Sequence, residues 1–229
     1  MSLKLQDINK ETDFPALARY MFETYEDPPQ KFFHLFFPIF GSDTTAREAA
    51  IEEAADRLKS WCLQDPTVTW KKVVDTETGR IAGAATWNTH LSNPFANTKP
   101  PSAYWFPDDG SRHWAEQALV QYATPRIQHV PRPHQYLFII FTHPSYRRQG
   151  VGQQLMDACL ANAEEHGLDT YLDSTPVGRP FYEVNGFQYI QENTTAPQNN
   201  SPDAEWKEMD DKVGPFTFWL MLKPLKNVD

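Results

Sequence analysis

Apolar residues recur every three to four positions in several segments, which is the spacing of a helix with one buried face. The first helix takes its N-cap from Thr12 or Asp13, and the second opens on a capping box that runs from Thr45 to Glu48. Pro125 predicts a kink or an end in the third. The predicted helices are residues 12–25, 45–62, 111–129, 150–166 and, shorter, 178–184.

Short apolar or alternating runs bounded by turn residues predict strands between these helices. The six-residue run Tyr136–Phe141 is too short for a buried helix, so we expect a central strand that is covered on both faces. Gly79 allows the positive φ that a tight turn between two strands requires. The predicted strands are residues 1–10, 68–75, 80–90, 136–141, 168–173, a strand from 187, and 216–222.

Three stretches are rich in Pro, Asn or Asp and lack a clear period. We interpret 27–40 as an irregular Phe-rich segment, 91–110 as a long loop, and 192–211 as a mobile loop. The length fits one large domain, or a domain with an added lobe. We therefore expect a single domain over 1–229, with insertions at 27–44, 91–130 and 192–212.

Composition narrows the class of protein. The net charge of −9 disfavours nucleic acid as a partner, because phosphates carry the same sign. The two cysteines, Cys62 and Cys159, lie in helical patterns and form no disulfide framework. No basic-apolar leader and no apolar stretch of about 20 residues occurs. We expect a cytoplasmic protein without membrane contact.

The turn from Pro144 to Gly152 joins the central strand to a helix and carries the clearest chemistry. Gly150 and Gly152 let the backbone fold tightly, and the first amides of a helix have no partners within it. The helix dipole and the charges of Arg147 and Arg148 add positive potential. This combination favours a diphosphate ligand.

Two familiar diphosphate loops do not fit this turn. A P-loop needs Gly-Lys followed by Ser or Thr, which is absent. The dinucleotide fingerprint needs a third glycine where Leu155 stands.

The pattern Arg-x-x-Gly-x-Gly after a hydrophobic strand instead resembles the acyl-coenzyme A loop of GNAT acetyltransferases. The segment Phe181–Phe187 is similar to the closing motif of that family, in which a tyrosine on a short helix precedes Gly-Phe and a strand. Tyr182 follows Gly152 by 30 residues, which leaves room for a helix, a strand and a short helix. The resemblance covers about residues 136–190.

The resemblance implies an α/β (α+β) fold. Its sheet is mixed but mostly antiparallel and twisted, with about seven strands, a splayed parallel central pair, and helices on both faces. It also implies that acetyl-CoA is bound as co-substrate. The loop residues that correspond to the family's pyrophosphate site are Arg147, Arg148, Gln149, Gly150, Val151 and Gly152.

The same resemblance implies the remaining roles. Tyr182 matches the acid that protonates the leaving thiolate, and the backbone of Ile139, Ile140, Phe141 and Thr142 matches the strand that holds pantetheine and the thioester carbonyl. The family commonly has Asn after the next strand. Here Ser174 and Thr175 stand there, a departure that leaves this pantetheine contact in doubt.

The general base and the acceptor are left open by the sequence. Candidates for the base are Glu23, Glu26, His34, His90, His134 and His143. An aromatic wall for a hydrophobic or cationic amine could come from Phe32, Phe33, Phe36, Phe37, Trp87, Tyr104 and Trp105. No Cys/His cluster indicates a metal site.

The expected activity is that of an N-acetyltransferase, an acyltransferase that moves acetyl from acetyl-CoA to a small-molecule primary amine. Two alternatives are acetylation of a protein N-terminus or lysine, and a coenzyme A-binding sensor without catalysis. A homodimer is an arrangement that the sequence leaves open.

Overall fold

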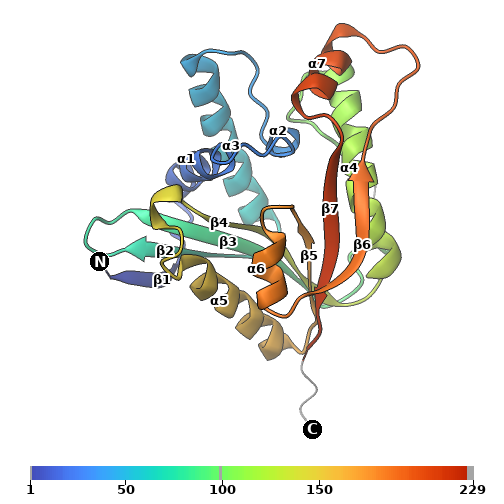
Figure 1. Cartoon of the computed structure of the whole chain (residues 1–229). Coiled ribbons are helices and arrows are strands. Elements are labelled where there is room, and N and C mark those ends of the chain that lie inside the picture. The colour runs from blue at the N-terminus through green and yellow to red at the C-terminus, as the bar shows by residue number, and fades with distance from the viewer. Residues whose placement is uncertain (1, 98–99, 226–229) are drawn as a thin grey trace.

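The computed structural model describes residues 2–97 and 100–225; Met1, residues 98–99 and the last four residues, which fall within predicted segments, lie outside this range. Seven strands form one sheet in the order β1-β2-β3-β4-β5-β7-β6 (Figure 1). The strands are β1 (Leu3–Asp7), β2 (Val68–Asp75), β3 (Ile81–His90), β4 (His134–Thr142), β5 (Thr170–Ser174), β6 (Gln188–Thr195) and β7 (Phe216–Lys223).

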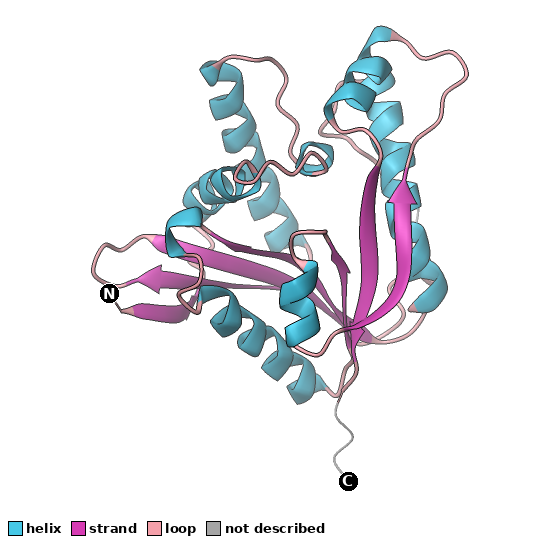
Figure 2. Cartoon of the chain, viewed as in Figure 1, coloured by secondary structure: helices cyan, strands magenta, loops and turns pink. Residues whose placement is uncertain are grey.

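The helices occupy both faces of this sheet (Figure 2). Helices α1 and α3 pack on one face and α5 on the other. Helices α4 and α7 pack together, with α4 alongside β6 and β7 (Figure 1). The helices are α1 (Phe14–Tyr25), α2 (Phe33–Phe36), α3 (Thr44–Gln64), α4 (Gly110–His129), α5 (Val151–His166), α6 (Arg179–Val184) and α7 (Ala204–Lys212), with a 3-10 turn at Pro144–Tyr146.

All neighbouring strands are antiparallel except β4 and β5, which are parallel. The pairing of β4 with β5 covers only Gln135 to Leu137 on β4 and Thr170 to Leu172 on β5. Beyond these pairs β4 continues beside β3, whereas β5 continues beside β7. The sheet therefore opens between its two central strands, and the fold class expected from the sequence is confirmed.

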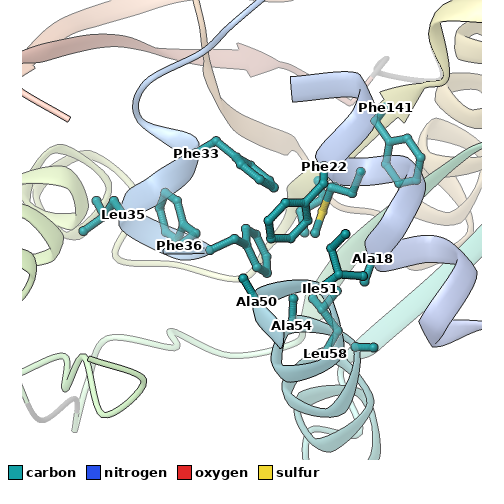
Figure 3. Packing of buried hydrophobic residues seen from close by; sticks show 14 of the residues in the cluster. Ala18, Phe22, Phe33, Leu35, Phe36, Ala50, Ile51, Ala54, Leu58 and Phe141 are labelled. Carbon is teal, nitrogen blue, oxygen red and sulfur yellow. The ribbon is translucent and has the colours of Figure 1, made fainter. Parts of the chain in front are cut away.

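The Phe-rich segment is folded into the core. Phe33 and Phe36 of α2 pack toward Phe22 of α1 and toward α3, where Ile51 lies among small alanines (Figure 3). The Phe22 and Phe33 rings meet edge to face at 4.9 Å. Burial of these rings fixes α2 against the α1–α3 layer, next to the opening in the sheet.

Three local predictions differ from the structure in whole or in part. Helix α3 is capped by Asp43, whose Oδ1 accepts from the Ala46 amide at 2.8 Å, and Glu48 of the predicted capping box instead binds Arg19. The predicted helix over 111–129 is confirmed as α4, which runs through Pro125 to His129, so this proline does not end the helix. Proline leaves the carbonyl four residues earlier without its helical partner, and Asn193 of β6 donates to that Gln121 carbonyl at 3.0 Å.

The third correction concerns residues 192–211, which are not one mobile loop. Strand β6 extends to Thr195, and α7 begins after Asp203, which accepts from the Trp206 amide at 2.8 Å. Trp206, Met209 and Val213 supply a buried stripe at helical spacing in an otherwise charged stretch. The polar composition hid this short apolar period.

Candidate functional site

A cavity of about 410 Å³ occupies the opening between β4 and β5. Residues 138–142 of β4 form one wall, and Asp173, Thr175 and Tyr182 lie on the β5–α6 side. The α1–α2 segment closes it with Tyr25 and the phenylalanines of α2. The cavity is therefore built from elements far apart in the sequence.

Strand β4 is irregular where it enters this cavity. Leu137 and Ile139 pair with the consecutive residues Trp87 and Thr86 of β3, so Phe138 is an extra residue in the strand. A β-bulge of this kind bends the strand and re-aims its neighbours. Leu137 joins the α5 side of the core, while Phe138 and Ile139 both pack on the α1 side, beside the opening.

The strand-to-helix turn lines a second cavity of about 380 Å³. Gly150 has φ of +82° and Arg148 has φ of +58°, so both occupy the left-handed region as α5 begins. The Arg148 side chain is exposed at this helix start. A Cβ on Gly152 would stand 3.5 Å from the Phe181 ring, so the glycine keeps the space between the turn and α6 open.

The two cavities are adjacent and share part of their walls. The shared residues are Ile140, Phe141, Thr142, Arg147, Gly178, Phe181 and Tyr182. A single ligand could thus run from the cationic helix start, along β4, into the aromatic chamber.

Arg147 lies between the turn and the α1–α2 segment. Its Nη2 donates to the carbonyls of Thr24 and Asp27, and its Nη1 is 3.5 Å from the Asp27 carboxylate. The side chain still lines both cavities. Arg147 therefore bridges the predicted diphosphate turn and the segment that covers the aromatic chamber.

Tyr182 lines both cavities at their junction. Burial raises the pKa of the Tyr182 phenol well above its usual range, so the hydroxyl is neutral and keeps its proton. Gly178 makes room for the ring, since a Cβ there would stand 2.9 Å from Tyr182 Cε2. Within the described residues, the Tyr182 hydroxyl has no hydrogen bond.

Two of the predicted site residues do not line either cavity. The Gln149 side chain donates back to the Ser145 carbonyl, and the Ser174 side chain is fully buried and donates to the Thr175 carbonyl at 2.9 Å. Thr175 does line the chamber, where its Oγ1 accepts from the Gly178 amide. The remaining predicted residues from Ile139 to Gly152 line one or both of the two adjacent cavities.

The aromatic candidates divide into two groups. Phe32, Phe33, Phe36 and Phe37 line the chamber. Trp87 faces α5 and donates to Asn162, while Trp105 packs on Trp61 outside the chamber and Tyr104 is exposed. Tyr25 stacks on Phe33, and burial raises its pKa to about 12.

None of the six candidate bases lines the chamber within the described residues. His143 accepts from the Ser145 amide and its Nε2 lies 2.8 Å from Glu23, which fixes the turn. Glu26 forms a two-point ion pair with Arg47. The rings of His90 and His134 pack against one another at a tilt of 57°, and neither residue lines the chamber.

His34, the remaining candidate, lines a separate and larger cavity of about 690 Å³ between residues 38–47 and α7. Burial lowers the pKa of this histidine. None of the predicted site residues lies there. The largest of these three cavities is therefore not the one that the predicted cofactor-binding residues line.

The sequence reasoning missed Asp173, the last carboxylate of β5. Its side chain is 4% exposed and its Oδ2 lies 3.0 Å from Nε of Arg126 on α4. The Tyr136 hydroxyl donates to the same oxygen at 2.9 Å, and the Tyr122 hydroxyl lies 2.9 Å from that of Tyr136. A carboxylate at the end of the apolar run Tyr171-Leu172 was the signal that could have found it.

We compared the chain with protein-family models and with curated protein sequences. Residues 109–189 match the family model described as acetyltransferase (GNAT) domain. The chain has the GNAT acetyltransferase fold. No curated protein sequence matches the chain. The GNAT match includes β4, the turn, α5, β5 and α6, which are the elements that surround the two cavities.

Solved structures agree over almost the whole length. Arylalkylamine N-acetyltransferase 2 from Aedes aegypti has a TM-score of 0.62 at 13% identity, covering 99% of this chain and 100% of that one. A protein described as histone acetyltransferase HPA2 and related acetyltransferase, from Corynebacterium glutamicum, has a TM-score of 0.56 at 20% identity, with 99% and 98% covered.

A third similar structure contains coenzyme A. The PaiA N-acetyltransferase from Thermoplasma acidophilum, in complex with coenzyme A, has a TM-score of 0.53 at 12% identity, covering 98% of this chain and 99% of that one. At these identities the likeness establishes the GNAT fold. Among residues 2–97 and 100–225, no helix combines the length and apolarity needed to cross a bilayer.

Proposed function

We propose that this GNAT chain transfers an acetyl group from acetyl-CoA to the primary amine of a small molecule by direct attack. The observation that carries the proposal is the pair of adjacent cavities, one at the α5 helix start and one in the aromatic chamber, which share Tyr182 in their walls. The turn suits the diphosphate of coenzyme A, and the opening between β4 and β5 suits its narrow pantetheine arm. The residues present thus fit this co-substrate.

The residues of the chain divide the chemistry between them. The amides at the start of α5 and the charge of Arg148 hold the diphosphate. Backbone groups from Ile139 to Thr142 orient the pantetheine and polarise the thioester carbonyl. Tyr182 donates a proton to the leaving thiolate. The phenylalanines of α2 exclude water from the chamber.

The covered chamber favours a small acceptor over a polypeptide. The α1–α2 segment lies over it, and Arg147 ties that segment to the turn. The likeness to an arylalkylamine N-acetyltransferase supports an amine with an apolar body. A protein N-terminus or lysine side chain, and binding without transfer, are the alternatives that the experiment below separates.

The first experiment measures thiol release from acetyl-CoA with a panel of amines. The panel contains arylalkylamines, polyamines, aminoglycosides, amino acids and short peptides. We expect turnover with a small amine that carries an apolar group. Turnover with peptides alone would contradict the small-molecule proposal, and coenzyme A binding with no turnover for any amine would contradict catalysis.

A further inference from the structure

The aromatic chamber contains a carboxylate that the functional proposal above does not use. Asp173 is the carboxylate that lines the chamber among the described residues, and rings of α2, β4 and β7 surround the rest of that space. Ionised carboxylates are rarely buried without a partner, because burial penalises the charged form. The burial of Asp173 beside the chamber therefore requires compensating groups, a function, or both.

Three groups hold this carboxylate in place. Arg126 provides the compensating charge, and its guanidinium lies between the Tyr122 and Tyr136 rings, 4.9 and 4.1 Å from their centroids. The Tyr136 hydroxyl donates its single proton to Asp173 Oδ2, and the Tyr122 hydroxyl lies 2.9 Å from the hydroxyl of Tyr136. Asp173 is thus fixed in one orientation beside the cavity.

The reaction needs a proton acceptor at this place. An alkylamine has a pKa near that of lysine, about 10.4, so roughly one molecule in a thousand is neutral at pH 7. Only the neutral amine has the lone pair that attacks the thioester. Among the described residues, Asp173 is the acidic side chain in contact with the chamber, whereas the bases predicted from the sequence lie elsewhere.

We propose that Asp173 binds the ammonium group of the acceptor and takes its proton. This inference rests on the proposed function. The ammonium loses one proton to the Asp173 carboxylate, and the neutral nitrogen forms its bond to the thioester carbon. The tetrahedral intermediate then breaks the carbon–sulfur bond, the second proton passes from nitrogen to the thiolate by way of Tyr182, and Asp173 returns its proton to solvent.

The electrostatic surroundings are consistent with this role. The titratable and charged groups that face Asp173 are Arg126 and Tyr122 of α4 and Tyr136 of β4, while its partner across the strand pair on β7 is Leu220. Burial raises the pKa of Asp173 and outweighs the opposing effect of Arg126 and the hydroxyls. The carboxylate is thereby a stronger base than one in water.

The test compares Asp173→Asn with wild type in kcat/KM for the best amine of the panel, between pH 7 and 10. We expect a loss of about 100-fold or more at pH 7, the usual contribution of a general base. The loss should shrink about tenfold per pH unit, because the neutral amine becomes abundant in solution. Coenzyme A affinity, measured by calorimetry, should stay at its wild-type value.

A merely structural defect gives a different pattern. It lowers the rate by the same factor at every pH, and that result would overturn the proposal, as would wild-type turnover by Asp173→Asn at pH 7. Wild-type enzyme that releases no thiol with any amine contradicts the proposed function itself. An active wild type with an equally active variant contradicts only the role of Asp173.

Tyr136→Phe provides a second test if Asp173→Asn does not fold. Removing this donor raises the pKa of Asp173, so the acid limb of the kcat/KM profile should move to higher pH. The matched control is Tyr171→Phe, which removes a β5 hydroxyl that binds Arg132 instead. An acid limb that moves equally in both variants, or in neither, would overturn the proposal.

Discussion

At the scale of single residues, packing restricts the side-chain conformations of the candidate site. Gly178 admits the Tyr182 ring, and Tyr182 in turn stands where the two cavities join. The absence of other partners for its hydroxyl among the described residues leaves that proton available to a ligand. We expect removal of the Tyr182 hydroxyl to change the rate of acetyl transfer more than the free energy of unfolding.

We therefore expect Tyr182→Phe to lower kcat by about 100-fold, the scale of one proton-transfer group. The dissociation constant for coenzyme A should change less than twofold, because the ring remains. Steady-state kinetics and calorimetry separate the two effects. The control is Tyr189→Phe, an exposed tyrosine on β6, and equal kcat for Tyr182→Phe and wild type would remove the proposed acid.

At the scale of elements, the turn before α5 concentrates positive potential at the end of a 16-residue helix. Arg147 and Arg148 have separate tasks despite being adjacent. Arg147 is committed to the α1–α2 segment, whereas the Arg148 side chain is exposed beside the helix start. Arg148 is therefore the cleaner probe of diphosphate binding.

Arg148→Ala should weaken coenzyme A binding by about tenfold at low salt, because a charge-assisted contact to phosphate is lost. The difference from wild type should narrow as salt rises, since exposed charges are screened. Calorimetry at two salt concentrations measures both effects. Lys207→Ala removes an exposed charge on α7 as the control, and an equal loss in both variants would argue against a specific contact.

Most helices and strands could be predicted because their sequence patterns involve residues that are close together in the chain. The order of helices and strands, the turn at Gly150 and the opening of β4 from β5 followed from local periods and a familiar motif. Helix α7 was missed because its two buried residues, Trp206 and Met209, lie among charged residues. The contacts of Asp173 with Arg126 and Tyr136 were missed for another reason. These residues come from β5, α4 and β4, and no local sequence pattern links them.

At the scale of the whole molecule, stability responds to groups distant from the cavity. His134 is 1% exposed, packs on His90 and Tyr171, and hydrogen-bonds the Arg132 carbonyl. Burial lowers its pKa to about 4, and burial also lowers the pKa of His90. Both rings are thus neutral in the native protein at neutral pH.

Unfolding should become easier in mild acid for this reason. In the unfolded chain His134 titrates near pH 6.5, so the unfolded state binds the proton first as the pH falls. The free energy of unfolding should drop between about pH 6.5 and 4, by up to about 3 kcal/mol from this residue. Urea unfolding at pH 7.5 and 4.5 measures the drop, and His134→Gln should lose part of it. An identical pH dependence in the variant would exclude His134 as its source.

The position of Arg147 has a consequence for the order in which substrates arrive. The guanidinium of Arg147 joins the cover of the chamber to the turn that a diphosphate would occupy. If the diphosphate of acetyl-CoA attracts the Arg147 guanidinium, the hydrogen bonds of Arg147 to the Thr24 and Asp27 carbonyls should weaken. The α1–α2 segment would then be free to move and admit the amine. Initial-rate patterns and product inhibition should then report a compulsory sequence, with acetyl-CoA entering before the acceptor and coenzyme A departing last.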